Sequence, residues 1–164
     1  MLPLVTPRLT IQPLRHADFQ ALHAVYSDPD VVRYVPDGVR DEAGTRRRLE
    51  ELMAHHEQYG VSKWAVILTS SGQVIGDCGL QFLPGTPNLE LGFHLARVYW
   101  GQGYATEAAV ACLQWALVHR PEKIVAVVDP AHLVSQRILS EIGMRPIGLE
   151  QLLNRTWLVY EVDQ

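Results

Sequence analysis

The chain has few cysteines, no long apolar run and no excess of basic residues. Its two cysteines, Cys78 and Cys112, are too few for a disulfide scaffold, and their apolar surroundings predict buried free thiols in a reducing cytoplasm. Lys and Arg number 14 against 18 Asp and Glu, which excludes a nucleic-acid partner because phosphate binding needs clustered positive charge. No apolar run reaches the ~20 residues that span a bilayer, so we expect no membrane partner.

Histidine is better represented, but its spacing does not suit a metal. The chain contains 7 histidines without an HExxH pattern. His55 and His56 are adjacent, so on a helix their rings would point apart. We therefore expect no metal ion in the site.

The length and the hydrophobic pattern predict one domain that comprises residues 1–164. The spacing of apolar residues and the turn signals between them define its elements. In chain order we expect a strand at 8–12, helices at 19–26 and from 43, strands at 64–68, 73–82 and 88–95, a helix at 104–119, a strand at 123–128, a helix at 131–142 ended by Gly143, and strands at 144–149 and 152–162. This order predicts an α+β fold with a mixed, largely antiparallel central sheet of about 6–7 strands and helices on both faces.

The segment 88–108 carries the most informative functional pattern. A predicted strand ends in a loop with Gly101 and Gly103, which opens directly onto a helix. Free N–H groups at a helix N-terminus bind phosphate, and glycines let the ligand approach the main chain. A P-loop would need Lys where Tyr104 stands, and a dinucleotide fingerprint would need Gly or Ala at Thr106. The pattern indicates either a different phosphate ligand or a plain glycine turn.

Residues 99–108, Tyr-Trp-Gly-Gln-Gly-Tyr-Ala-Thr-Glu-Ala, resemble the coenzyme loop of the GNAT superfamily of N-acetyltransferases. Within it they are most similar to the ribosomal-protein N-terminal acetyltransferases. The superfamily pattern is Gln/Arg-x-x-Gly-x-Gly/Ala, and residues 100–105 match it except at Trp100, which is usual in this branch. Weaker likeness at 6–9, 27–31, 74–76 and 129–144 extends the resemblance over nearly the whole chain.

The resemblance implies an acyl-CoA N-acyltransferase fold and direct transfer of an acetyl group from acetyl-CoA to a primary amine. It implies no metal and no covalent enzyme intermediate. The pantetheine arm would pair with residues 89–95, and the pyrophosphate would lie on the N–H groups of residues 101–105. The cofactor-binding residues implied are Phe93, His94, Leu95, Trp100, Gly101, Gln102, Gly103, Tyr104, Ala105, Thr106 and His132.

Two catalytic residues follow from the resemblance and from the pattern. Glu90 interrupts the apolar alternation of its strand and occupies a position where many relatives carry a glutamate, so it is the first candidate for the general base. His94 is the alternative base, and both can also be read as structural. Ser135 lies on the inward stripe of its helix, where it would protonate the departing thiolate or cap the first helical turn.

Two positions depart from the superfamily. Leu139 stands where many members have a tyrosine acid, and His132 replaces a helix-opening asparagine. These departures keep a second hypothesis open, a non-catalytic sensor that binds acyl-CoA.

The connection between the two N-terminal helices would overhang the acceptor side. Asp30, Arg33 and Tyr34, with Asp37, are the candidate substrate-binding residues there, because loops carry binding groups disproportionately. The acceptor stays open between a protein N-terminus and a small molecule such as a polyamine, amino sugar or amino acid. The assembly stays open between monomer and homodimer, with Trp157 and Tyr160 on a last strand that could pair across a dimer edge.

Overall fold

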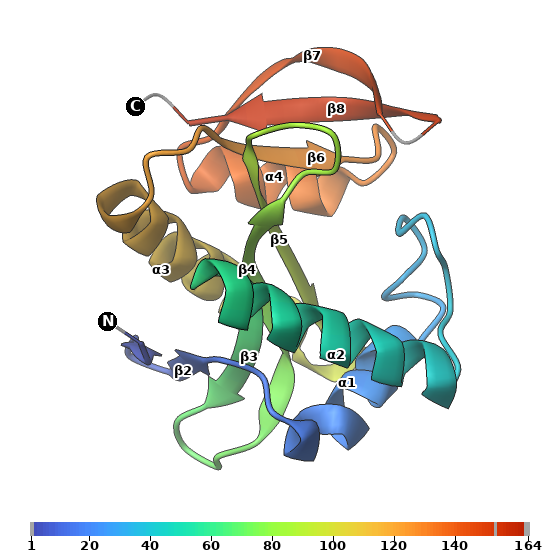
Figure 1. Ribbon diagram of the computed structural model, residues 1–164, viewed down its shortest axis with the longest axis vertical. Helices are drawn as coiled ribbons and strands as arrows, with labels where there is room; N and C mark the ends of the chain where they lie inside the picture. Colours follow the sequence, from blue (N-terminus) through green and yellow to red (C-terminus); the bar gives the residue numbers. More distant parts are fainter. Residues whose placement is uncertain (1, 153, 163–164) are drawn as a thin grey trace.

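The computed structural model describes residues 2–152 and 154–162 (Figure 1). Its elements are β1 (Leu4–Val5), β2 (Leu9–Gln12), η1 (His16–Asp18), α1 (Phe19–Tyr26), α2 (Glu42–Tyr59), β3 (Lys63–Leu68), β4 (Val74–Phe82), β5 (Leu89–Leu95), η2 (Arg97–Tyr99), α3 (Tyr104–His119), β6 (Ile124–Val128), α4 (Leu133–Glu141), β7 (Arg145–Leu152) and β8 (Arg155–Glu161).

The strands form one sheet of 8 strands in the order β1-β2-β3-β4-β5-β6-β8-β7. Neighbours are antiparallel except β5 and β6, which run parallel. The α+β class with a mixed, largely antiparallel sheet is therefore confirmed. The two-residue strand β1 is an addition, since a pair of residues shows no alternation that a pattern could reveal.

The contact between β5 and β6 is short. Only Leu89 with Ile124 and Glu90 with Val125 are paired, whereas β6 continues to pair with β8 as far as Val128. The two strands therefore separate beyond Glu90, and the rest of β5 has β4 as its only partner strand. The sheet opens at this point.

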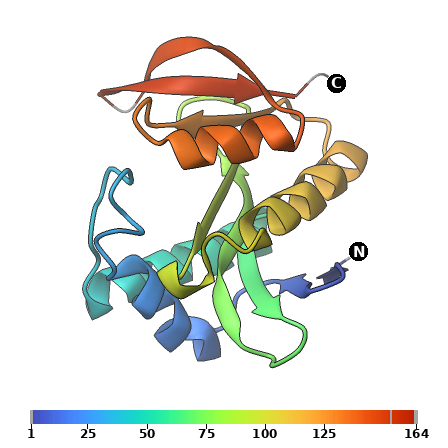
Figure 2. The same ribbon diagram turned by 180° about the vertical axis from the view of Figure 1, so that it is seen from behind.

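Helices cover both faces of the sheet, as predicted. One apolar core lies between the sheet and α3, with Leu139 of α4 contributing to it. A second core joins Ala65 of β3 to α1 and α2 on the opposite face. Figure 1 shows α2 in front of β4 and β5, and Figure 2 shows α3 and α4 on the other side. Because side chains alternate along a strand, Leu89, Leu91 and Leu95 face α3 and leave Glu90 and His94 on the α1–α2 face.

Two expectations about the C-terminal strands were wrong. The predicted break at residues 150–151 falls later, because β7 continues to Leu152 and Asn154 adopts a left-handed conformation with φ of 60° that asparagine tolerates. Leu153, inside the expected strand 152–162, lies outside the described residues. The last strand is also not an edge: β8 lies between β6 and β7, so Trp157 and Tyr160 are buried and β7 forms the edge. Strand order depends on pairing between distant segments, which local patterns do not encode.

Candidate active site

The phosphate-type loop has the predicted geometry. Gly101 and Gly103 adopt left-handed conformations with φ of 72° and 80°, and α3 begins directly after Gly103. The first intrahelical bond runs from the Glu107 N–H to the Gly103 carbonyl at 3.0 Å. The N–H groups of residues 101–105 precede it, and among the described residues none of them has an acceptor. They form an anion-binding helix N-terminus of the expected kind.

Arg8 supports this loop, a role that the sequence did not reveal. Its Nε lies 2.6 Å from Glu107 Oε2, and its Nη1 donates to the Gln102 carbonyl at 2.8 Å. Its guanidinium also lies over the Tyr104 ring, 4.4 Å from the centroid. Partial burial acts to raise the pKa of Glu107, but hydrogen bonds from Thr6 and Arg8 outweigh it and hold that pKa below its usual range. The first turn of α3 is therefore tied to the segment before β2 by a charged contact.

The free edge of β5 is the second part of the site. Ala96 donates its N–H to Ile75 on the β4 side, and Leu89 donates to Lys123 on the opposite side. Since bonding directions alternate along a strand, the main-chain groups of Leu91, Phe93 and Leu95 face away from β4, toward the opening left by β6. Trp100 Nε1 donates to the Leu95 carbonyl at 2.8 Å and so joins this edge to the glycine loop.

A polar cluster lies on the α1–α2 face of β4 and β5. Asp77 is fully buried, lies directly opposite His94 in the sheet, and has its Oδ1 3.1 Å from His94 Nδ1. Tyr26 of α1 donates its hydroxyl to the other oxygen, Oδ2, at 2.6 Å. Burial acts to raise the pKa of Asp77, but the charge and hydrogen bond of His94, with Lys63 and Tyr26, hold it below its usual range. Asp77 is therefore ionised at neutral pH.

Glu90 belongs to the same face but has a different environment. It is partly buried, and among the described residues no hydrogen bond to its carboxylate is found. Burial raises its pKa above the usual range, against the opposing charges of Lys63, His94 and Arg48. The Lys63 side chain reaches this point because Gly92 leaves room: a Cβ at Gly92 would lie 2.7 Å from Lys63 Nζ.

The N-terminus of α4 holds the remaining predicted residues. Ser135 Oγ lies 3.2 Å from His132 Nε2, so its hydroxyl contacts the imidazole, and among the described residues it makes no bond to a free helix N–H. The His132 ring stacks on Tyr34, with centroids 4.4 Å apart and planes within 19°. Burial, with a smaller repulsion from His94, lowers the pKa of His132 despite the opposing Asp129. A neutral imidazole thus links the connection after α1 to the start of α4.

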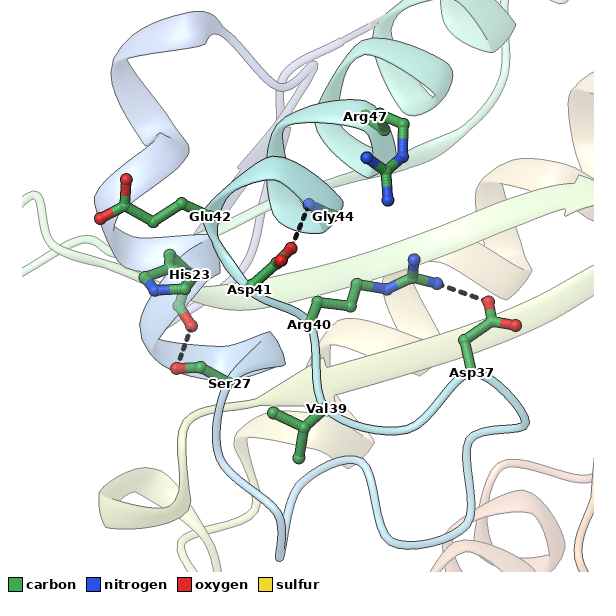
Figure 3. A pocket seen from close by; sticks show the side chains of 9 residues that line it. All are labelled: His23, Ser27, Asp37, Val39, Arg40, Asp41, Glu42, Gly44 and Arg47. Carbon is green, nitrogen blue, oxygen red and sulfur yellow. Dashed lines mark hydrogen bonds and ion pairs between the residues drawn. The ribbon is translucent and has the colours of Figure 1, made fainter.

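The other predicted acceptor residues lie apart from this stack. Asp30 forms an ion pair with Arg97 at 2.8 Å, Arg33 is exposed, and Asp37 pairs with Arg40 at 2.7 Å. Asp37 also lines a pocket of about 900 Å³ between α1 and the start of α2 (Figure 3). Its other lining residues are His23, Ser27, Val39, Arg40, Asp41, Glu42, Gly44 and Arg47. Glu90, His94 and the glycine loop do not contribute to that pocket, so we place the reacting groups elsewhere.

The cysteines do not provide a nucleophile. Cys78 and Cys112 are free and buried, and burial raises the pKa of the Cys78 thiol well above its usual value. Across residues 2–152 and 154–162 there is no group of three metal-binding side chains. No helix in those ranges is long and apolar enough to cross a bilayer.

The structure thus brings the predicted residues together in two groups. The glycine loop and the free edge of β5 form one, and Glu90, His94, Ser135, His132 and Tyr34 surround the α1–α2 side of the opening. Asp77 and Tyr26 were missed. A lone aspartate inside the apolar strand Ile-Gly-Asp-Cys-Gly-Leu was the available signal for Asp77, whereas Tyr26 reads as an ordinary apolar position of its helix.

Comparison with known proteins agrees with this architecture. The acetyltransferase (GNAT) domain matches residues 8–145. The chain is 33% identical to the uncharacterized protein YkkB of Bacillus subtilis (strain 168), over 96% of this chain and 94% of that protein. It is 30% identical to the uncharacterized N-acetyltransferase YnaD of the same organism, over 88% and 84%.

Solved structures extend the comparison. The acetyltransferase from Agrobacterium tumefaciens str. C58 superposes with a TM-score of 0.87 at 31% identity, covering 100% of this chain and 95% of that one. Mycobacterium smegmatis RimJ in complex with CoA-disulfide has a TM-score of 0.79 at 18% identity, covering 94% and 81%, and shows the shared fold alone.

The chain therefore belongs to the GNAT family of acetyltransferases, which confirms the resemblance of residues 99–108. It is an acetyltransferase, and an acyl-CoA cosubstrate and an amine acceptor go with that activity. The relatives give no support to the non-catalytic sensor.

Proposed function

We propose that the protein transfers the acetyl group of acetyl-CoA directly to a primary amine, without a metal and without a covalent enzyme intermediate. The observation that carries this proposal is the free edge of β5, which leads directly to the open N-terminus of α3. An extended amide-containing arm that ends in a pyrophosphate has the length and chemistry to use both. The bound coenzyme would supply an activated thioester.

Residues on the coenzyme side would bind and orient. The N–H groups of residues 101–105 favour the pyrophosphate charge, with Gly103 keeping the approach open. The main-chain groups of Leu91, Phe93 and Leu95 can pair with the arm, and an N–H near Phe93 or Leu95 can stabilise the oxyanion. His94, Trp100, Gln102, Tyr104, Ala105, Thr106 and His132 complete the proposed coenzyme contacts.

Residues on the other side would move protons. Glu90 and His94 are the two candidate bases, since both side chains lie on the α1–α2 face of β5. Ser135 is the candidate donor to the departing sulfur. Its hydroxyl contacts a neutral imidazole, which favours a relay over a helix cap.

The acceptor would enter beneath the connection after α1. Tyr34 and Asp30, with Arg33, are the proposed contacts for a protein N-terminus or a small amine. The buried free thiols favour a reducing compartment such as the cytoplasm.

The test is calorimetric titration with acetyl-CoA and with CoA, followed by an amine screen that measures thiol release. The screen should contain an N-terminal serine peptide, spermidine, glucosamine and a free amino acid. Micromolar binding with turnover of at least one amine supports the proposal. Failure of both coenzymes to bind would remove it.

A further inference from the structure

His94 is held by a buried carboxylate, as a general base often is. Asp77 is 0% exposed, whereas the His94 side chain is 20% exposed, so the carboxylate lies behind an imidazole that still reaches the site. The Asp77–His94 contact of 3.1 Å joins residues that face each other across β4 and β5. Both partners therefore lie on paired strands, which fix a side chain more firmly than a loop does.

The hydrogen bonds specify the tautomer of His94. An ionised carboxylate can only accept, so Nδ1 must carry the proton in the bond to Asp77 Oδ1. The second oxygen is already occupied by the Tyr26 hydroxyl, which lies 2.6 Å away and donates. The Tyr26 ring meets the His94 ring edge to face, with centroids 6.0 Å apart. The remaining nitrogen, Nε2, is left with its lone pair.

Glu90 lacks such an arrangement. The Lys63 ammonium lies over Gly92, between the positions of Glu90 and His94 on the same face, and partly offsets the Glu90 charge. Glu90 also lies at the last paired position of β5 and β6, whereas His94 lies beside the separated part of β5. The carboxylate is therefore better suited to attract an ammonium than to receive its proton.

We propose that His94 Nε2 is the proton acceptor for the amine, and that Asp77 and Tyr26 are positioning residues that fix its tautomer and orientation. This role rests on the proposed acetyl transfer. The acceptor ammonium gives a proton to Nε2, its nitrogen forms the new C–N bond, and the C–S bond breaks as the sulfur leaves with the electron pair. The second amine proton passes to the sulfur, and His94 later returns its own to solvent.

The first test reads the tautomer and does not need an acceptor. Long-range ¹H–¹⁵N spectra of ¹⁵N-labelled protein should show His94 with a protonated Nδ1 and a bare Nε2 near neutral pH, with the signal assigned by its loss in His94→Gln. In Asp77→Asn, the amide group that replaces Oδ1 should donate to Nδ1 and move the proton to Nε2. Tyr26→Phe removes only the second bond, so the tautomer should stay unchanged. A wild-type Nε2–H, or no switch in Asp77→Asn, would overturn the proposal.

The second test uses an amine that the screen shows to be acetylated. His94→Gln should lower kcat by about 10²–10⁴-fold, the usual contribution of a general base, with coenzyme Kd unchanged. Asp77→Asn should also lower kcat, by up to about 10⁴-fold if the imidazole is held in the wrong tautomer. The double variant should be no slower than His94→Gln alone, because the two residues act as a unit.

The exposed His16 provides the control, since His16→Gln should leave kcat and the fold unchanged. Wild-type-like kcat in folded His94→Gln would contradict the assignment. If no amine is acetylated by the wild type, the proposed transfer fails, whereas the tautomer spectrum still decides the Asp77–His94 arrangement by itself.

Discussion

The ring of Tyr34 lies nearly parallel to the ring of His132, with 4.4 Å between their centroids. Tyr34 belongs to the connection between α1 and α2, and His132 precedes α4, so the stack bridges the two sides of the opening. Figures 1 and 2 both show this connection rising from α1 toward α4. The bridge closes the acceptor side over the sheet.

Removing the bridge should affect the acceptor more than the coenzyme. We expect Tyr34→Ala to raise the acceptor KM by roughly tenfold, consistent with loss of an aromatic contact of about 0.5–1.5 kcal/mol. The Kd for CoA should stay within about twofold. Steady-state kinetics and calorimetry measure the two effects, and Arg33→Ala, exposed in the same connection, is the matched control. A larger effect on CoA than on the acceptor would place Tyr34 in the coenzyme site.

Gly103→Val should abolish CoA binding. A Cβ at Gly103 would lie 3.2 Å from Arg8 Nη2, and the left-handed φ of 80° disfavours a β-branched residue. Both effects disturb the N–H groups that would hold the pyrophosphate. Calorimetric titration with CoA checks the result. Gly85→Val is the control, because Gly85 has φ of 77° with nothing within 4 Å of a Cβ. Equal weakening by both variants would attribute the loss to backbone strain.

Gly92→Ala should destabilise the protein through Lys63. The new Cβ would lie 2.7 Å from Nζ and 2.8 Å from Cε of a lysine that is only 8% exposed. Overpacking of this kind costs about 1–3 kcal/mol. Denaturant unfolding of Gly92→Ala, Lys63→Ala and the double variant would measure the coupling. We expect the second substitution to cost less in the presence of the first, and strict additivity would contradict the contact.

Glu90→Gln should stabilise the protein near neutral pH. Burial raises the folded-state pKa of Glu90 above 4.5, so the ionised side chain costs folding free energy above the raised pKa, and this cost vanishes below about pH 4.5. The variant should melt at a higher temperature at about pH 7.5 and at the same temperature at about pH 4. Thermal unfolding at the two values decides the matter, with the exposed Glu57→Gln as control. A gain that persists at the lower pH would have another origin.

Much of the fold follows from local signals. Short polar turns between alternating segments predict β3, β4 and β5, and the glycine loop before an apolar stripe locates the start of α3. The anion-binding part of the site was predictable for the same reason, because its residues are contiguous in the chain.

The proton-handling part was only half predictable. Glu90 and His94 stand out because they interrupt an apolar strand, but Asp77 meets His94 only through the β4–β5 register and Tyr26 only through the packing of α1. The burial of Trp157 depends on the order β6-β8-β7, which is decided by pairing between segments far apart in sequence.

The short contact between β5 and β6 links the supply of cosubstrate to the lifetime of the protein. With only two register pairs joining these strands, a molecule that fills the opening would add to the cohesion of the whole chain. A ligand at 100 times its Kd stabilises a folded protein by about 2.7 kcal/mol. Starvation for the acyl donor would therefore stop turnover and also expose the enzyme to proteolysis, so its abundance would track the metabolic state of the cell.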